Sequence, residues 1–267
     1  MSTLTSSFHV VRYSAANAVA DFRATYTWRS WTFGWLGRML AQVTFFATMG
    51  LALHSSASAH YLVVGNAVMT CVVEAMTVVT SSAWERRQGT LPLLAASPAR
   101  LIWVFFGRSL QWPVSGSVTS LVALLGLAPL FGVVWSPEQV PVLVGLVLLT
   151  AVSTYCVGLF LAAFVLSASQ ARNIVSNVGY LVMMAICGVQ VPVSFWPDWV
   201  GVVARTLPLT HTLAGVRGVA AGAGAGAIVQ QAAWAVLAGA CWLGAAAVAF
   251  ARLQLHARRS GHFDFAE

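Results

Sequence analysis

Residues that can do chemistry are few in this sequence, and they are widely scattered. One acidic side chain, Glu74, falls deep inside an apolar stretch, where a charge costs about 2.5–3.5 kcal/mol on insertion scales. A carboxyl in that position can contact a substrate cation or a proton at a subunit interface. It can equally be a neutral, hydrogen-bonded group packed inside a helix bundle, and both interpretations stay open.

Histidines and cysteines form no pattern typical of a metal site or a disulfide framework. His54, His60 and His211 are not spaced as metal ligands, and we expect them to make interfacial hydrogen bonds. The cysteines lie inside apolar stretches without a CxxC pair, which favours small buried side chains: Cys71, Cys156, Cys187 and Cys241. We therefore expect no metal on this chain.

Hydrolytic chemistry has no pattern here either. An intramembrane aspartyl protease needs paired aspartates within spans, whereas Asp21, Asp198 and Asp264 all lie outside the apolar runs. The sequence has no HExxH or GxSxG pattern. All 14 basic residues are arginine, so the lysine of a phosphate-binding P-loop is missing. We expect no catalytic residue, and any ATP that drives the protein must bind to another chain.

The composition indicates that lipid surrounds the chain. Hydrophobic residues make up 59% of it and charged residues only 8%, whereas soluble domains carry roughly 25% charged residues. A chain this apolar cannot cover its own surface with polar groups. Its net charge of +7 comes from arginines scattered beside apolar runs, which fits lipid headgroups rather than nucleic acid.

Apolar runs predict an all-α membrane protein with six transmembrane helices. Each run is long enough to cross a hydrocarbon core of about 30 Å with some tilt. The runs are 33–53, 61–84, 109–134, 141–167, 173–193 and 229–251. Before them, residues 8–30 place apolar side chains at steps of three and four, with Arg12 and Arg23 at the edge of the stripe. This spacing predicts an amphipathic helix on the inner membrane surface, with an ordinary solvated helix as the alternative.

Arginine positions predict the orientation in the membrane. If the N-terminus is inside, 12 of the 14 arginines lie in cytoplasmic segments, and Arg205 and Arg217 lie outside. The positive-inside rule favours this arrangement. The first 30 residues also lack the apolar core of a cleavable signal peptide. We therefore expect a multi-pass protein of the cell (inner) membrane with both termini in the cytoplasm.

Two segments between the spans are neither spans nor simple loops. The 85–108 segment, on the expected cytoplasmic side, reads ERRQGTLPLLAASPARLIWVFFGR. Its apolar residues must pack on the membrane surface, the bundle or a partner protein. The 192–227 segment, on the outer side, reads PVSFWPDWVGVVARTLPLTHTLAGVRGVAAGAGAGA. Pro197 and Pro208 divide it into one or two re-entrant or interfacial helices, with Asp198 as a possible helix cap and residues 220–227 as a flexible joint.

Both segments resemble signatures of the permease subunits of type-2 ATP-binding-cassette exporters. The first is similar to the pattern E-R-x-x-G-T-L…L…S-P, with matching residues Glu85, Arg86, Arg87, Gly89, Thr90, Leu91, Leu94, Ser97 and Pro98. The second is similar through Pro192, Trp196, Pro197, Asp198, Trp199, Leu207, Pro208, Leu209, Thr210, His211 and Arg217. The resemblance covers essentially the whole chain. Position 92 is proline where the family often has an acidic residue, so we expect no charge contact to an ATPase from that position.

The resemblance implies a mechanism, partners and cofactors. A coupling helix in the 85–108 segment would dock into a groove of a separate ATPase, with Gly89, Thr90, Leu91 and Leu94 in the groove. Glu85, Arg86 and Arg87 would pair with charges there. ATP and magnesium would bind to the ATPase and not to this chain. Two ATPases and a second permease, identical or homologous, would complete the unit. The substrate, a hydrophobic or amphipathic molecule such as a drug, antibiotic or lipid, would leave the cell between the permeases, with Glu74 as a candidate contact.

Other functions stay open on the sequence. A secondary transporter or channel without an ATPase would favour inverted repeats with broken helices, or conspicuous charged pore residues, and neither is visible. Within the family, polymer export, immunity and import share the same scaffold, so the sequence does not identify the substrate.

Overall fold

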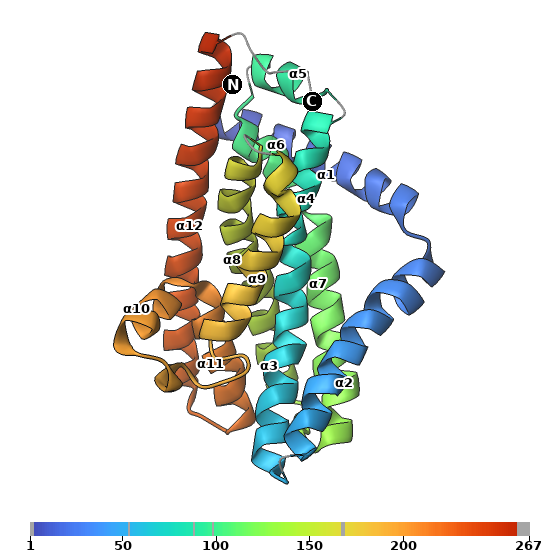
Figure 1. Cartoon of the computed structure of the whole chain (residues 1–267), viewed down its shortest axis with the longest axis vertical. Helices are drawn as coiled ribbons and strands as arrows, with labels where there is room; N and C mark the ends of the chain where they lie inside the picture. Colours follow the sequence, from blue (N-terminus) through green and yellow to red (C-terminus); the bar gives the residue numbers. More distant parts are fainter. Residues whose placement is uncertain (1–2, 53, 88, 98, 167–168, 261–267) are drawn as a thin grey trace.

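The computed structural model describes residues 3–52, 54–87, 89–97, 99–166 and 169–260, and every regular element in those ranges is a helix. The longest helices run along one axis of the molecule, and shorter helices gather at its two ends (Figure 1). The all-α architecture that the sequence predicts is therefore confirmed.

The N-terminal helices form an angled arm followed by a hairpin. α1 (Thr3–Thr25) lies across one end of the bundle, which we call the α1 end (Figure 1). A π-helical stretch, η1 (Ser30–Leu36), runs directly into α2 (Gly37–Ala52), which descends to the far end. There the chain turns back into α3 (Ser56–Ala75), and the Ser55 side chain accepts a hydrogen bond from the Ser58 N–H.

The middle of the chain crosses the bundle twice more. After a one-residue break at Met76, α4 continues α3 back to the α1 end, and α5 lies at that end (Figure 1). The chain then returns to the far end through α6, α7 and two short helical stretches. The bounds are α4 Thr77–Arg87, α5 Leu91–Ala96, α6 Leu101–Arg108, α7 Gln111–Val122, η2 Ala123–Leu127 and η3 Ala128–Phe131.

The last part of the chain brings its final helix back to the α1 end. α8 and α9 run along the bundle, α10 and α11 lie at the far end, and α12 returns as one long helix (Figure 1). The bounds are α8 Gln139–Val165, η4 Ser169–Ala171, α9 Arg172–Ile186, η5 Val193–Phe195, α10 Asp198–Thr206, α11 Pro208–Ala220 and α12 Ala225–Ser260. The first and last helices therefore share one end of the molecule.

Within the described residues, four helical stretches are long and apolar enough to cross a membrane. They are Ser56–Glu85, Leu101–Phe131, Gln139–Val165 and Ala225–Ala257. These coincide with the second, third, fourth and sixth predicted spans. The first and fifth predicted spans correspond to shorter helices, α2 with 16 residues and α9 with 15. The protein is therefore a multi-pass membrane protein.

Three boundaries differ most from the sequence prediction. The third stretch begins at Leu101 rather than at 109, because Leu101 and Phe105 are buried in the core. α9 ends at Ile186 rather than at 193, because Gly188 has φ +86°, outside the helical region. α12 continues to Ser260, well past the predicted end at 251.

Close helix contacts hold the bundle together. α3 packs against α2, α7 and α8, and α8 packs against α12 and α11. A Cβ at Gly116 of α7 would lie 2.9 Å from the Cys71 carbonyl oxygen of α3, so only glycine allows this approach. Small residues at such crossings let membrane helices gain van der Waals contact that lipid cannot replace.

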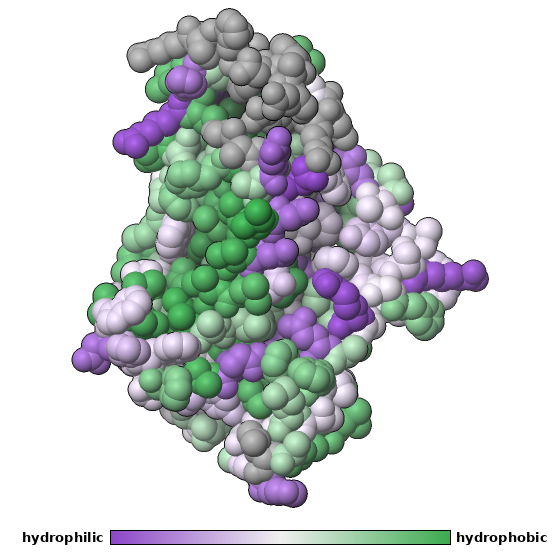
Figure 2. All heavy atoms as spheres, viewed as in Figure 1, coloured by the Kyte–Doolittle hydropathy of each residue, from purple (hydrophilic) through white to green (hydrophobic). Residues whose placement is uncertain are grey.

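The visible face has a hydrophobic part and a polar part. Figure 2 shows strongly hydrophobic side chains gathered on the left of the middle of the molecule. Hydrophilic side chains gather in a strip that descends from the α1 end over the middle of this face. α9 contributes exposed polar side chains, Asn173 and Asn177, in its first turns. A helix bundle in lipid has an apolar exterior. A narrow polar strip on that exterior indicates a face that does not contact lipid.

Candidate functional site

The 85–108 segment folds as a helix, a turn, a short helix and a second helix at the α1 end. α4 ends at Arg87, and Gly89 follows with φ +69°, the left-handed conformation in which glycine is favoured. Thr90 is the N-cap position of α5, and Pro92 lies in its first turn, where a missing N–H is tolerated. Arg100 is extended (ψ 124°) and precedes α6.

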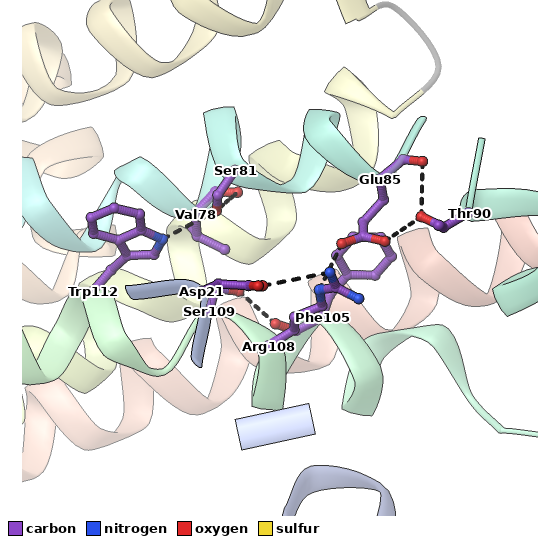
Figure 3. A network of polar contacts seen from close by, with 9 residues as sticks. All are labelled: Asp21, Val78, Ser81, Glu85, Thr90, Phe105, Arg108, Ser109 and Trp112. Carbon is purple, nitrogen blue, oxygen red and sulfur yellow. Dashed lines mark hydrogen bonds and ion pairs between the residues drawn. The ribbon is translucent and has the colours of Figure 1, made fainter. Parts of the chain in front are cut away.

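An ion-pair network centred on Arg108 fixes this segment to the rest of the molecule. The Arg108 Nε lies 2.6 Å from Glu85 Oε1, and Arg108 Nη2 lies 3.5 Å from Asp21 Oδ2 (Figure 3). The Thr90 hydroxyl donates to the other Glu85 oxygen and to the Glu85 carbonyl (Figure 3). One guanidinium therefore joins α1, α4 and α6, and the threonine ties the turn before α5 to the same carboxylate.

The position of Glu85 differs from what the family resemblance implies. Its side chain was expected to pair with charges on a partner, yet it is 4% exposed and paired with Arg108 of its own chain. Asp21 and Arg108 were not among the predicted site residues. The signal for Arg108 was present, since it is the cation that directly follows the apolar run 101–107.

The outward-facing residue of α5 is also different from the expected one. Leu91 is 1% exposed and belongs to the core, whereas Leu93 is 74% exposed. Leu94 is partly buried against that core, and the Ser97 hydroxyl donates to the Leu94 carbonyl at 2.8 Å. Among the α5 side chains that the structure describes, Leu93 is thus the exposed apolar one at the α1 end.

Parts of the predicted set lie outside what the structure describes. Pro98 is outside the described residues, and so are the side chains of Arg86 and Arg87. Gly89 and Thr90 are described and partly exposed. The described members of the signature thus lie together at the end of α4, in the turn that follows it, and in α5 with its C-cap Ser97.

A polar cavity adjoins the ion-pair network. It has a volume of about 190 Å³ and is lined by Asp21, Glu85 and Arg108, with Ser82 and Gln111 among the other wall residues. Ser82 Oγ and Gln111 Oε1 are buried without a hydrogen-bond partner among the described residues. A space of this size holds several water molecules, which would satisfy these atoms and hydrate the ion pairs.

Glu74 lies inside the bundle. Its side chain is 0% exposed, on the face of α3 that meets α7, where a Cβ at Gly116 would be 3.0 Å from Glu74 Cβ. Ser115, Thr119 and the Trp35 indole surround the carboxyl, but no described group makes a hydrogen bond of normal geometry to either oxygen. The residues that surround the Glu74 carboxyl therefore belong to α7 and η1, which enclose it inside the bundle.

The 192–227 segment folds as two helices at the far end (Figure 1). Pro197 is the N-cap residue of α10, so the predicted capping role of Asp198 is wrong. Asp198 is instead the first residue of the helix, where its charge complements the helix dipole. Pro208 opens α11, where proline is favoured, and η5 follows Pro192. A turn at 221–224 separates α11 from α12.

Two side chains of α11 hold this far end together. The Arg217 Nη1 donates to the Gly188 carbonyl at 2.7 Å, and its guanidinium lies 3.5 Å from the Tyr61 ring centroid. The His211 Nε2 lies 2.9 Å from the Arg205 carbonyl oxygen, and its Nδ1 lies 3.1 Å from Gln231 Oε1. These contacts of α11 with neighbouring elements have a structural role.

The tryptophans of the same segment play different parts. The Trp196 indole donates to the Ala185 carbonyl at 3.1 Å, which anchors the loop to the end of α9. Trp199 is 71% exposed on α10. Across the described residues, no group of three or more His, Cys, Asp or Glu could hold a metal ion. Of the cysteines, Cys241 is exposed, contrary to the expectation that all four are buried.

Comparison with known proteins identifies the family. A family model described as ABC-2 type transporter matches residues 17–220, which is more than half of the chain. The match includes the whole 85–108 segment and α10 and α11, and it stops before α12. A comparison with curated proteins returned no match. The chain therefore belongs to the ABC-2 type transporter family and is the permease component, the membrane subunit, of an ABC-type transporter.

Proposed function

We propose that this permease is the membrane subunit of an ATP-driven exporter that moves a hydrophobic or amphipathic substrate out of the cell. A separate ATPase would bind ATP and magnesium. The observation that carries the proposal is α5, a six-residue helix that presents Leu93, 74% exposed, at the α1 end. An apolar side chain on a short, braced helix is suited to a groove on a partner protein.

We propose six membrane crossings with both termini in the cytoplasm. η1 and α2 form one continuous helical stretch, Ser30–Leu36 and Gly37–Ala52, of which α2 packs along α3. α9 packs on α4 and α8. α9 runs alongside the longer helices, whereas the η1–α2 stretch approaches them at an angle and meets α3 toward the far end (Figure 1). An even number of crossings would account for the shared end of α1 and α12, and the arginine distribution favours the cytoplasmic side for that end.

The terminal and far-end helices have interfacial roles in this topology. α1 lies across one end of the bundle (Figure 1), and at the cytoplasmic surface it would rest in the headgroup layer as an amphipathic helix. α10 and α11, with nine and 13 residues, are too short to span and would form the re-entrant outer segment. The domain unit is the single transmembrane domain 1–267.

Coupling would act through the Arg108 network. A displacement of α5 would be transmitted to α4 through Thr90 and Glu85, and to α1 and α6 through Arg108. Nucleotide-driven closure of two ATPases would thereby shift the spans of two permeases as rigid bodies. The second permease is identical or homologous.

The substrate path would run between the two permeases, along the polar strip of Figure 2. Glu74 is our candidate contact within this path. Because its carboxyl is enclosed by α3, α7 and η1, a substrate or proton would reach it only when η1 separates from α7. A buried carboxyl whose oxygens lack full partners is a reason to expect such a contact.

Purification from the native membrane in mild detergent tests the proposal, with mass spectrometry of every co-purifying protein. We expect an ATPase of the nucleotide-binding type, and a second permease sequence if the unit is a heterodimer. A chain that comes alone under every gentle condition would favour a secondary transporter or channel instead.

A further inference from the structure

α12 makes a specific contact at the α1 end with the 85–108 segment, which we call the coupling segment. The Gln254 Nε2 donates to the Ala99 carbonyl at 3.0 Å, and its Oε1 accepts from the Leu101 N–H at 3.5 Å. One side-chain amide therefore uses both its donor and its acceptor on the chain that joins α5 to α6. A bidentate contact of this kind fixes position and direction as well as distance.

Apolar packing supports the same contact. Phe250 of α12, 1% exposed, stacks on Phe105 of α6 with ring centroids 5.2 Å apart. α12 packs against α5 as well as against α6. Stacked aromatic pairs stabilise a contact beyond their buried area alone. The coupling segment thus rests on α12 through both α5 and α6.

At the far end, α12 is bonded to both outer helices. The Trp242 indole donates to the Thr206 carbonyl at the end of α10, at 2.9 Å. Gln231 Oε1 lies 3.1 Å from His211 Nδ1 of α11, and the Trp234 ring stacks on His211 at 6.3 Å. α12 also packs along α11.

Between these two sets of contacts α12 is one uninterrupted helix. It runs for 36 residues, Ala225–Ser260, and contains no proline. Gln231 and Gln254 are 23 positions apart, which is about 35 Å along a helix. A helix without a proline kink can transmit a displacement along its axis, because the chain has no such point at which to bend.

We propose that α12 is the strut that carries movement of the coupling segment to α10 and α11, and that Gln254 is the positioning residue that fastens the coupling segment to it. The inference rests on the proposed function, because it needs an ATPase that moves α5. It adds to that function a direct route from the ATPase side to the outer helices, and it assigns a role to Gln254 that no signature residue supplies.

A cysteine reporter at Trp199 tests the strut. Trp199 is 71% exposed on α10, and Cys241 is the exposed native cysteine of the described part. The protein would carry Trp199→Cys and Cys241→Ala, in membranes with its ATPase. The rate of reaction with a membrane-impermeant maleimide would be measured without nucleotide and with ATP plus vanadate.

In the protein that retains Gln254, we expect nucleotide to change the labelling rate. In Gln254→Leu, we expect this nucleotide-dependent change to be about fivefold smaller, because one to two hydrogen bonds are lost. The ATPase should still co-purify with the variant and hydrolyse ATP, because Leu93 is untouched. The matched control is Gln230→Leu, an exposed glutamine of α12 outside these contacts, which should keep the full response. His211→Phe, which keeps a ring against Trp234 but removes both bonds, should act like Gln254→Leu.

Three results would overturn the strut. One is an unchanged nucleotide response in both Gln254→Leu and His211→Phe. A second is an equal loss in Gln230→Leu, which would indicate a general effect on α12. A third is a reporter that never responds to nucleotide although the ATPase is bound and active. Failure of the ATPase to co-purify with the parent protein is a separate result, and it would count against the proposed function itself.

Discussion

Individual side chains fix the position of the coupling segment, and Arg108 contacts two carboxylates, those of Glu85 and Asp21. Glu85 is almost fully enclosed, so its carboxylate depends on the Arg108 guanidinium at 2.6 Å for compensation. Removing one partner from a buried pair leaves a charge without compensation, which costs more than the pair contributes. The Asp21 contact at 3.5 Å is more exposed and contributes less.

We expect Arg108→Gln to lower the free energy of unfolding by about 3 kcal/mol, at the lower end for a broken buried pair because Arg108 is partly exposed. Thermal denaturation of the detergent-purified protein would measure it. Glu85→Gln combined with Arg108→Gln should recover part of the loss, since both charges are then gone. Arg100→Gln, at an exposed position, is the control, and an equal loss there would contradict the assignment.

Glu74→Gln should alter transport or substrate range without a loss of stability. The amide has nearly the same shape as the carboxyl, so packing against Ser115 and Thr119 is retained while the ionisable group is removed. Transport assays with several amphipathic substrates would show the effect. Unchanged transport and range would remove Glu74 from the substrate path and leave it a packing role.

At the scale of elements, the sequence predicted helices better than their faces. The amphipathic spacing predicted α1, and long apolar runs predicted α8 and α12, because each of these signals extends over many turns. α5 has only six residues, too few for periodicity to show that Leu91 points inward and Leu93 outward. The early end of α9 depends on Gly188 in a left-handed conformation, which a sequence pattern of apolar residues does not reveal.

The contact of α1 with α6 can be tested at Gly107. A Cβ at that position would lie 2.7 Å from the Val11 carbonyl oxygen and 2.7 Å from Ser14 Cβ. We expect Gly107→Val to push α1 away from α6, with a stability loss of about 1–3 kcal/mol for overpacking. Limited proteolysis should then cut α1 faster. Gly126→Val, with open space around its Cβ position, is the control, and equal protection of α1 in both variants would argue against the contact.

At the scale of the whole molecule, the chain is a bundle with the proposed partner surface, α5, at one end and two short helices, α10 and α11, at the other. Composition predicted the membrane, and two signatures predicted the family, which the match to residues 17–220 confirms. The ion pairs that hold the coupling segment could not be predicted from the sequence, because Asp21, Glu85 and Arg108 meet only in the folded chain. Polar contacts between residues far apart in the chain produce no periodic pattern in the sequence.

The most direct measurement of the central claim is the amount of ATPase that co-purifies with Leu93→Asp. The side chain is 74% exposed, so the substitution should leave the fold intact while it places a charge in the partner's groove. The control is Leu255→Asp on α12, at a leucine that is 55% exposed. We predict that Leu93→Asp loses the ATPase and Leu255→Asp retains it. Full retention of the ATPase by Leu93→Asp would contradict the assignment of α5 as the docking helix.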